Sequence, residues 1–403
     1  MRDAPNPYNQ PVTTPPVARS RAHRTTRPSV ARALIAVLAA ALIGALAGLG
    51  LWSSGFRAVP SAAGPDSTPV VLTASSPSPR LTPSSATPAE ALLATTTDPQ
   101  ACAVSFAGDD PAVASLAPLL ETQGTRYSEL PIPRRDGAVF AGWYTSAADA
   151  AAYTSPARMN PGRLVTCANQ RQTLYAAWKT PAQVAADKVA VPILMYHQFT
   201  DKPGGESGWL RLNYLYIGDF DQQMKYLHDQ QFYLPSWPEL EAFIDGTLAL
   251  PPRSVIVTDD DADSTWHALA VPVVEKYQVL TTSFVITKWF SQPLNSPWVL
   301  ERSHTNDMHD AGANGKGRMV NYTLDQIVAD MNTSAQLLGA KEVMAYPFGH
   351  YNATAEQALT EAGFDLARTT EHGYVRQGTK KLELPCIRMD YGTSMQTFIK
   401  SVG

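Results

Sequence analysis

From residue 187 onward, short apolar segments alternate with amphipathic ones, and this alternation constrains the fold more than any other feature of the chain. The apolar segments have the length of buried strands, whereas the amphipathic ones repeat apolar residues at helical spacing. Strands that alternate with helices predict a parallel sheet covered by helices, which is an α/β fold. Periodicity alone does not decide between an open sheet and a closed barrel.

The pattern predicts strands at residues 192–197, 254–258, 282–286, 343–346 and 366–370. Asp219 is expected to cap the first helix of this region. Thr323 and Gln326 form a capping box for a later helix, which ends at Gly339. A region with this many elements is predicted to be one domain over residues 187–403.

Residues 33–52 contain no charge and are rich in Ala and Leu, and a stretch of this length can span a membrane as a helix. The preceding residues 1–32 carry six Arg and one acid, Asp3, so this basic tail has a charge of +5. Positive charge on this side predicts a cytoplasmic N-terminus, with the body of the protein outside the plasma membrane. The alternative is a signal peptide cleaved near residues 61–63, which would release a secreted protein.

The remaining 371 residues carry the rest of the net charge of −4, which makes them −9 in total. A nucleic-acid partner requires a basic surface, so the composition argues against one. Residues 53–98 are dominated by Ser, Thr, Pro and Ala, and such a segment is expected to act as an extended linker.

Residues 99–180 are predicted to form a small separate unit. Its aromatic segments at 139–144 and 173–178 have the pattern of short strands. We interpret these aromatic side chains as core residues, with a sugar-stacking surface as the alternative. Cys102 and Cys167 flank the unit and can pair in an oxidising compartment, which leaves Cys386 as a free thiol.

Three polar motifs carry the chemistry of the chain. Residues 257–262 read Val-Thr-Asp-Asp-Asp-Ala, residues 304–309 begin and end with His, and residues 346–349 read Tyr-Pro-Phe-Gly. Carboxylate and imidazole ligands suit a divalent metal that activates water, and a further carboxylate can take the proton. Neighbouring carboxylates also raise each other's pKa unless a cation is present, so the acidic cluster itself argues for a metal.

These motifs resemble, in order and separation, those of the NodB-type polysaccharide deacetylases (carbohydrate esterase family 4). The resemblance covers about residues 190–395 and implies a distorted (β/α)7 barrel with its site at the C-terminal strand ends. Residues 99–180 resemble the Listeria–Bacteroides (internalin B-type) repeat, a β-grasp-like module. The fold predicted for the whole chain is therefore a transmembrane helix, a small β-grasp-like domain and an α/β barrel.

The resemblance implies a role for each polar residue. Asp260 would be the general base, and Asp261, His304 and His309 would bind the metal, with zinc as the expected ion and nickel or cobalt as alternatives. The backbone N–H of Phe348 would stabilise the oxyanion. A shifted register would instead bring Asp259 or Asp263 into the site.

The spacing of the two imidazoles excludes a regular helix for the segment that carries them. Two residues at i and i+5 lie about 140° apart on a helix, so His304 and His309 must occupy a loop to share one ion. The longer spacing is similar to that of the branch that acts on poly-N-acetylglucosamine. His197 at the end of the first strand is the predicted general acid, and His372 is the second choice.

Four departures from the family pattern favour the alternative that the domain is a decayed enzyme scaffold that only binds carbohydrate. Asp259 replaces Phe, Ala262 replaces Gly, the Arg of the third motif is absent, and the late His is absent. The missing Arg leaves the orientation of Asp260 without an explanation, and Ala262 would be strained in a left-handed turn by about 1 kcal/mol.

The sequence therefore predicts a metal-dependent hydrolase that removes N-acetyl groups from an extracellular amino-sugar polysaccharide, without a further cofactor. Peptidoglycan and poly-N-acetylglucosamine are the leading substrates. The alternatives are a decayed scaffold that only binds carbohydrate at the cell surface, or another metal-dependent amide hydrolase. The sequence sets no oligomeric state.

Overall fold

The computed structural model describes residues 86–403 of the chain. The predicted basic tail, the predicted transmembrane helix and most of the predicted linker lie outside the described residues. Among the helices of residues 86–403, none combines the length and the apolar character needed to cross a bilayer.

The first part of the described chain contains a four-stranded mixed sheet in the order β2-β1-β4-β3. Its strands are β1 (Ala101–Ala107), β2 (Leu119–Thr122), β3 (Val139–Tyr144) and β4 (Arg171–Lys179). Strands β1 and β4 pair in parallel, and the other two pairs are antiparallel. The short helices around it are α1 (Pro88–Leu93), α2 (Pro111–Ala114), α3 (Ala147–Ala152) and α4 (Pro181–Asp187).

A disulfide and an aromatic core hold this sheet together. Cys102 and Cys167 form the disulfide, with their Cα atoms 6.0 Å apart, so the predicted pairing is confirmed. Phe140 and Trp143 are buried, and their rings meet edge to face with centroids 5.1 Å apart. These two aromatic residues therefore belong to the core, as predicted, and not to a sugar-stacking surface.

The second part is a closed barrel of seven parallel strands, which confirms the predicted α/β fold and its parallel sheet. The strands are β5 (Ile193–Tyr196), β8 (Ile256–Asp261), β9 (Thr281–Val285), β10 (Val299–Ser303), β11 (Val343–Ala345), β12 (Leu366–His372) and β13 (Leu384–Arg388). Strand β13 pairs with β5 and closes the ring, whereas β10 and β11 are joined through a single pair, Ser303 with Met344. The barrel is therefore closed, but the extent of strand pairing varies around the ring.

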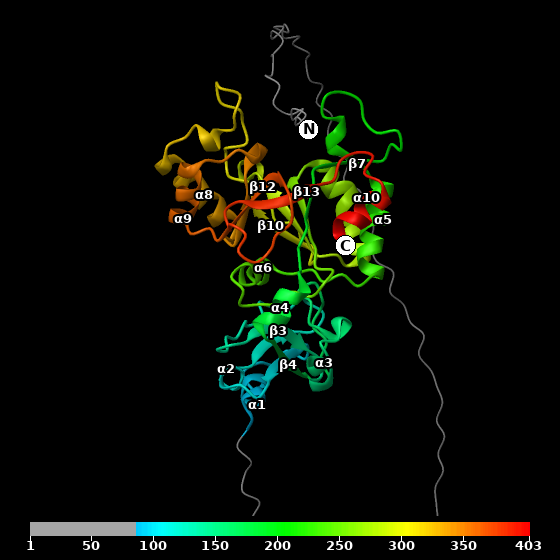
Figure 1. Ribbon diagram of the computed structural model, residues 1–403, viewed down its shortest axis with the longest axis vertical. Helices are drawn as coiled ribbons and strands as arrows, with labels where there is room; N and C mark the ends of the chain where they lie inside the picture. The colour runs from blue at the N-terminus through cyan, green and yellow to red at the C-terminus, as the bar shows by residue number, and fades with distance from the viewer. Residues whose placement is uncertain (1–85) are drawn as a thin grey trace, which may run out of the picture. The chain divides into compact units, whose positions relative to one another are not determined.

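Helices cover the outside of the barrel. They are α5 (Ile217–Asp229), α6 (Trp237–Ile244), α7 (Val271–Tyr277), α8 (Leu324–Leu338), α9 (Ala353–Ala362) and α10 (Met395–Val402). Helices α8 and α9 pack side by side on one flank, and α5 and α10 on the other (Figure 1). A two-stranded parallel sheet, β6 (Gln198–Thr200) with β7 (Tyr214–Tyr216), follows β5.

Of the helix caps predicted from the sequence, the capping box of α8 is confirmed and the cap of α5 is wrong. Thr323 and Gln326 form the predicted capping box of α8, and Gly339 ends this helix in the left-handed conformation. The prediction for Asp219 is wrong, because α5 begins at Ile217 and Tyr216 occupies the cap position without a side-chain hydrogen bond. Asp219 instead lies in the first turn, where a carboxylate is favoured by the helix dipole.

The small sheet packs on the barrel through backbone contacts and a shared apolar core. Phe140 donates its backbone N–H to Thr247 O at 3.2 Å and accepts from Ala249 N at 2.7 Å. Phe140, Trp143 and Trp237 belong to one apolar cluster with the residues inside the barrel. The two parts are thus joined by buried apolar surface as well as by the chain.

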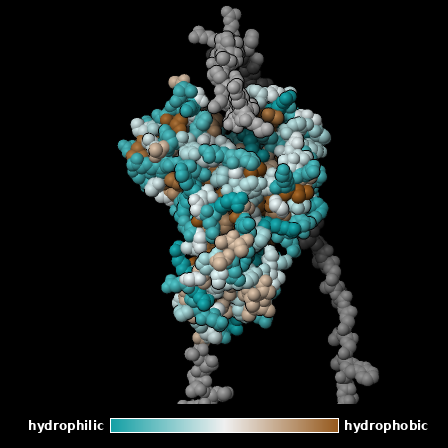
Figure 2. All heavy atoms as spheres, in the orientation of Figure 1, coloured by the Kyte–Doolittle hydropathy of each residue, from teal (hydrophilic) through white to brown (hydrophobic). Residues whose placement is uncertain are grey.

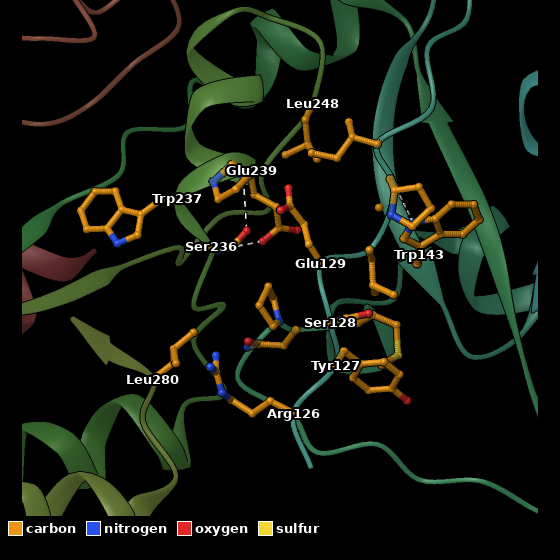
Figure 3. Close-up of a pocket in the computed structure, with 18 of the residues that line it drawn as sticks. Arg126, Tyr127, Ser128, Glu129, Trp143, Ser236, Trp237, Glu239, Leu248 and Leu280 are labelled. Atoms are coloured by element: carbon orange, nitrogen blue, oxygen red, sulfur yellow. Dashed lines mark hydrogen bonds between the residues drawn. The ribbon is translucent and has the colours of Figure 1, made fainter. Parts of the chain in front are cut away.

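A pocket of about 300 Å³ lies at this junction. Trp143 of β3 and Trp237 of α6 lie on its two sides, with Glu129 between them and Arg126 at one edge (Figure 3). Leu280 and Glu342 also line it, and both precede the first residue of a barrel strand. The pocket therefore lies at the N-terminal ends of the strands.

The face of the molecule in Figure 2 is mostly hydrophilic, and its hydrophobic residues are scattered in small groups. Two tryptophans are nevertheless largely exposed: Trp209 is 89% exposed and Trp289 is 65% exposed.

Candidate active site

The first polar motif ends strand β8 at the C-terminal end of the barrel. Asp260 and Asp261 are its last residues, and successive side chains of a regular strand would point to opposite faces. The backbone leaves the strand conformation at this point, because Asp261 has φ 77° and Ala262 has φ 51°. Ala262 therefore does occupy a left-handed turn, as expected for the position where the family has Gly.

Three ligand atoms converge beside this turn. One atom each from Asp261, His304 and His309 lies within 4.8 Å of the other two. Asp261 Oδ1 is 3.5 Å from His304 Nε2 and 3.1 Å from His309 Nε2. Bonds of about 2.0–2.1 Å to a tetrahedral zinc ion separate ligand atoms by about 3.3 Å. The observed separations bracket this value, so the three side chains have the spacing of a metal site.

The surroundings of the three side chains also fit a divalent ion. His304 is buried, and its Nδ1 lies 2.9 Å from Ala345 O, so Nδ1–H donates and Nε2 keeps a free lone pair. Asp261 Oδ1 is buried beside the two imidazoles, and no other group of the described residues donates a hydrogen bond to it. Burial alone would raise the pKa of Asp261, but the two imidazoles hold it well below its usual range. A carboxylate and two imidazoles suit zinc, nickel or cobalt.

The two imidazoles lie on a loop after β10, as their spacing predicts. Thr305 has φ 71° and is buried, so the chain turns sharply between them. The carboxylate of Asp330 on α8 accepts the backbone N–H groups of Asn306 and Asp307 at 2.7 and 2.8 Å. Asp330 thus fixes the loop. The sequence does not reveal this role, because Asp330 looks like any acid on a helix surface.

Arg368 on β12 orients Asp260. Its Nη2 donates to Asp260 Oδ1, and both side chains are almost fully buried. Burial alone would raise the pKa of Asp260, but the charge of Arg368 lowers it, so the carboxylate is ionised at neutral pH. The expectation that Asp260 lacks an arginine partner is therefore wrong, because a different strand supplies it. The signal available in the sequence was a lone Arg within the apolar strand predicted at 366–370.

His197 lies beside the same carboxylate. Its Nε2 is 3.8 Å from Asp260 Oδ2, the oxygen that Arg368 does not hold. Burial lowers the pKa of His197, although the charge of Asp260 acts in the opposite direction. His372, the second choice for the general acid, is exposed at the end of β12. Among residues 86–403 it makes no ion pair with Asp260 or Asp261.

The two other acids of the motif lie outside the group of three ligands. Asp259 is fully buried, and burial together with the charge of Asp260 raises its pKa well above the usual range. Asp263 Oδ1 accepts the backbone N–H groups of Thr265 and Trp266 and so begins the next helical segment. These contacts favour the register in which Asp260 and Asp261 face the site.

Phe348 lies in the turn after β11, close to the imidazoles. Its ring centroid is 4.5 Å from that of His309, and its side chain is 45% exposed. The backbone at Phe348 has φ 60°, and Gly349 follows with φ 69°. A Cβ at Gly349 would lie 2.1 Å from Thr370 Oγ1, so this turn requires glycine. The oxyanion role of the Phe348 N–H stays a prediction.

Known proteins are similar to this part of the chain. Residues 248–367 match the family model described as polysaccharide deacetylase. A poly-beta-1,6-N-acetyl-D-glucosamine N-deacetylase of Staphylococcus aureus (strain MRSA252) is 26% identical over an alignment of 194 positions that covers 42% of this chain. The chain covers 65% of that relative's length, slightly less than two thirds.

Two solved structures are also similar. The Streptococcus pyogenes deacetylase PplD, solved in complex with acetate, has a TM-score of 0.46 and 23% identity, over 54% of this chain and 99% of the other. IcaB from Ammonifex degensii has a TM-score of 0.44 and 21% identity, over 53% of this chain and 95% of the other. The family match thus places a region similar to polysaccharide deacetylases in the C-terminal part of the chain.

Proposed function

We propose that the protein hydrolyses the N-acetyl groups of an extracellular amino-sugar polysaccharide, either poly-N-acetylglucosamine or peptidoglycan. The observation that carries this proposal is the joint position of a metal-ligand set and a separate, ionised base. Asp261 and the two imidazoles provide the ligands. Asp260 directly precedes Asp261 in the chain and has an arginine partner of its own. The similarity to an enzyme named for poly-beta-1,6-N-acetyl-D-glucosamine favours that polymer.

Asp261, His304 and His309 would hold the divalent metal, which we expect to be zinc. Such an ion polarises a carbonyl and makes water a nucleophile at neutral pH. Asp260 would take the proton of the attacking water at Oδ2, because Arg368 holds Oδ1. The backbone N–H of Phe348 would donate to the oxyanion that develops on the acetyl oxygen.

The departing amine needs a proton, and we propose that His197 supplies it. Its Nε2 faces Asp260 Oδ2 at 3.8 Å, so a proton gained by Asp260 lies close to the imidazole. Burial keeps His197 neutral at rest, because it lowers the pKa. The imidazole would thus carry a proton only after Asp260 has taken one from water, and would pass it to the amine.

The location of this chemistry is also a proposal. Residues 33–52 would anchor the chain in the plasma membrane with the N-terminus in the cytoplasm, and residues 53–98 would link the anchor to the body. The disulfide between Cys102 and Cys167 supports export, since such bonds persist in oxidising compartments. The family model begins at residue 248, so the assignment of residues 99–180 to a β-grasp-like internalin B-type module keeps only the support of its motifs.

Replacement of the base tests the proposed chemistry. Asp260→Asn keeps the size of the side chain but removes the proton acceptor, so acetate release from N-acetylglucosamine oligomers should fall by at least about 1,000-fold. Metal content, measured on the same preparation, should remain at one ion per chain. An Asp260→Asn protein with near-normal turnover would show that another residue is the base. A wild-type protein that binds metal and oligomer but releases no acetate would favour the decayed-scaffold alternative.

A further inference from the structure

A cleft of about 660 Å³ opens beside the metal ligands. Asp261 and His309 form part of its wall, and residues 285–294 after strand β9 form another part. A cleft of this volume lies within the usual range for a small-molecule site and exceeds what an acetyl group requires. Because Asp261 and His309 line it, the cleft lies within reach of a group attached to the sugar that reacts.

Trp289 is the most exposed large aromatic residue that lines this cleft. It ends a short helical turn, Thr287–Trp289, and its side chain is 65% exposed. Backbone hydrogen bonds hold this turn against the imidazole loop, from Thr287 N to Thr305 O and from Lys288 N to Asn306 O, each at 3.0 Å. The backbone that carries Trp289 is therefore fixed relative to the metal ligands, and most of the indole surface faces solvent. Burial of such a ring against a ligand would be favourable.

Polar groups with unused acceptor capacity lie in the same cleft. Glu301 accepts the backbone N–H of Leu294 through Oε2 at 3.0 Å, and its Oε1 accepts no hydrogen bond from the residues described. Gln198 is 9% exposed, and its amide lies next to the ligand Asp261, with Nε2 3.5 Å from Oδ2. The other amide atom, Gln198 Oε1, is buried without a partner within residues 86–403. Glu301 Oε1 therefore suits a hydroxyl group of a sugar, whereas Gln198 Oε1 is buried beneath the surface of the cleft.

We propose that this cleft binds a second sugar unit of the polymer, the neighbour of the unit that reacts, and that Trp289 stacks on its ring. This inference rests on the proposed function for the identity of the polymer. An aromatic platform beside an acceptor matches a pyranose, which offers C–H groups on its faces to the indole and hydroxyl groups at its edge to the acceptor. Trp289 is then a residue that makes the protein select a polymer over a single sugar.

The test measures binding and not turnover. All variants are made in the full-length Asp260→Asn protein loaded with zinc, and calorimetry gives the affinity for an N-acetylglucosamine hexamer and for the monosaccharide. Trp289→Ala should weaken hexamer binding by about tenfold and leave monosaccharide binding within twofold. Trp289→Phe, which keeps a stacking ring, should retain most of the affinity.

Trp209 provides the matched control. It is 89% exposed and does not line the cleft, so Trp209→Ala should bind the hexamer as tightly as the parent. Equal affinities of Trp289→Ala and Trp209→Ala would overturn the proposal, and so would a parent protein that binds no hexamer. If the wild type releases no acetate but hexamer binding depends on Trp289, the proposed chemistry fails while the sugar subsite stands.

Discussion

At the C-terminal ends of the barrel strands, Asp261 and Thr305 combine an unusual backbone conformation with burial or partial burial in the site, whereas Arg253 and Gln278 at the N-terminal ends do so on exposed turns. Asp261 and Thr305 have positive φ within the site. Arg253 and Gln278 also have positive φ, but they are exposed and precede strands β8 and β9. Gln278 only ends helix α7 in the ordinary left-handed way.

The two ends also differ in how they use buried surface. The N-terminal end shares an apolar cluster with the small sheet, which contributes Phe140 and Trp143. The C-terminal end buries Asp260 with Arg368 and sets Asp261 Oδ1 against the two imidazoles. Strain persists where function requires it and the rest of the structure offsets its cost. The N-terminal end therefore stabilises the fold, and the C-terminal end carries the chemistry.

Removal of Arg368 should have the largest effect. Arg368→Met leaves a carboxylate buried without its partner, which typically costs about 3–5 kcal/mol of the free energy of unfolding. The double variant Arg368→Met with Asp260→Asn removes both charges and should recover most of this loss in urea denaturation. Arg388→Met is the control, because Arg388 pairs with Asp390 in a partly exposed position and should cost less than about 1 kcal/mol. A double variant no more stable than the single one would contradict a charge-pairing role.

A substitution at the other end should change stability alone. Gly142 on β3 has φ 100°, and a Cβ there would lie 2.4 Å from Nε of the buried Arg158. Gly142→Ala should therefore lower the free energy of unfolding by about 2–3 kcal/mol. Metal affinity, measured by calorimetry on the folded protein, should match that of the wild type. A parallel loss of metal affinity would show that the two ends are coupled.

Metal binding should depend on pH through His309. Burial alone would lower the pKa of His309, but the hydrogen bond and charge of Asp261 raise it above the ordinary value of 6.5. A metal binds the neutral imidazole, so affinity should be constant above this pKa and fall by about tenfold per pH unit below it. Calorimetric titration with zinc between pH 8 and 5.5 measures the slope. An affinity that stays constant down to pH 5.5 would exclude His309 as a ligand.

The smallest effect is expected at Ala262. Its φ of 51° is sterically unfavourable for Ala, which has a Cβ, but not for Gly. Ala262→Gly should therefore relieve about 1 kcal/mol of backbone strain. Part of this gain is lost, since Gly has more freedom in the unfolded chain. Thermal unfolding should thus show a small increase in stability with acetate release unchanged. A clear loss of stability would mean that the Ala262 methyl group contributes packing that outweighs the strain.

The sequence predicts those parts of the fold that depend on local pattern. Strands β5, β8, β9, β11 and β12 lie within a few residues of the predicted segments. Strand β10 was missed because Glu301 and Arg302 interrupt its apolar pattern, and β13 was missed because Pro385 lies within it. Local pattern also could not show that β13 pairs with β5 to close the barrel, since these strands are far apart in the chain.

The candidate site shows the same limit. The sequence placed Asp261, His304 and His309 in one group, because a metal requires such ligands and the motifs resemble a known family. It did not reveal Arg368 or Asp330, which reach the site from β12 and α8 only after the barrel has formed. The absent arginine of the third motif was visible, but its replacement depends on how β12 faces β8 across the barrel.

The most direct test of the account is acetate release by the full-length protein from β-1,4 and β-1,6 N-acetylglucosamine oligomers, with zinc and after chelation. We expect acetate release that chelation abolishes and added zinc restores, with β-1,6 oligomers preferred over β-1,4 oligomers. The contradicting result is an absence of release from either oligomer by protein that carries one zinc ion per chain.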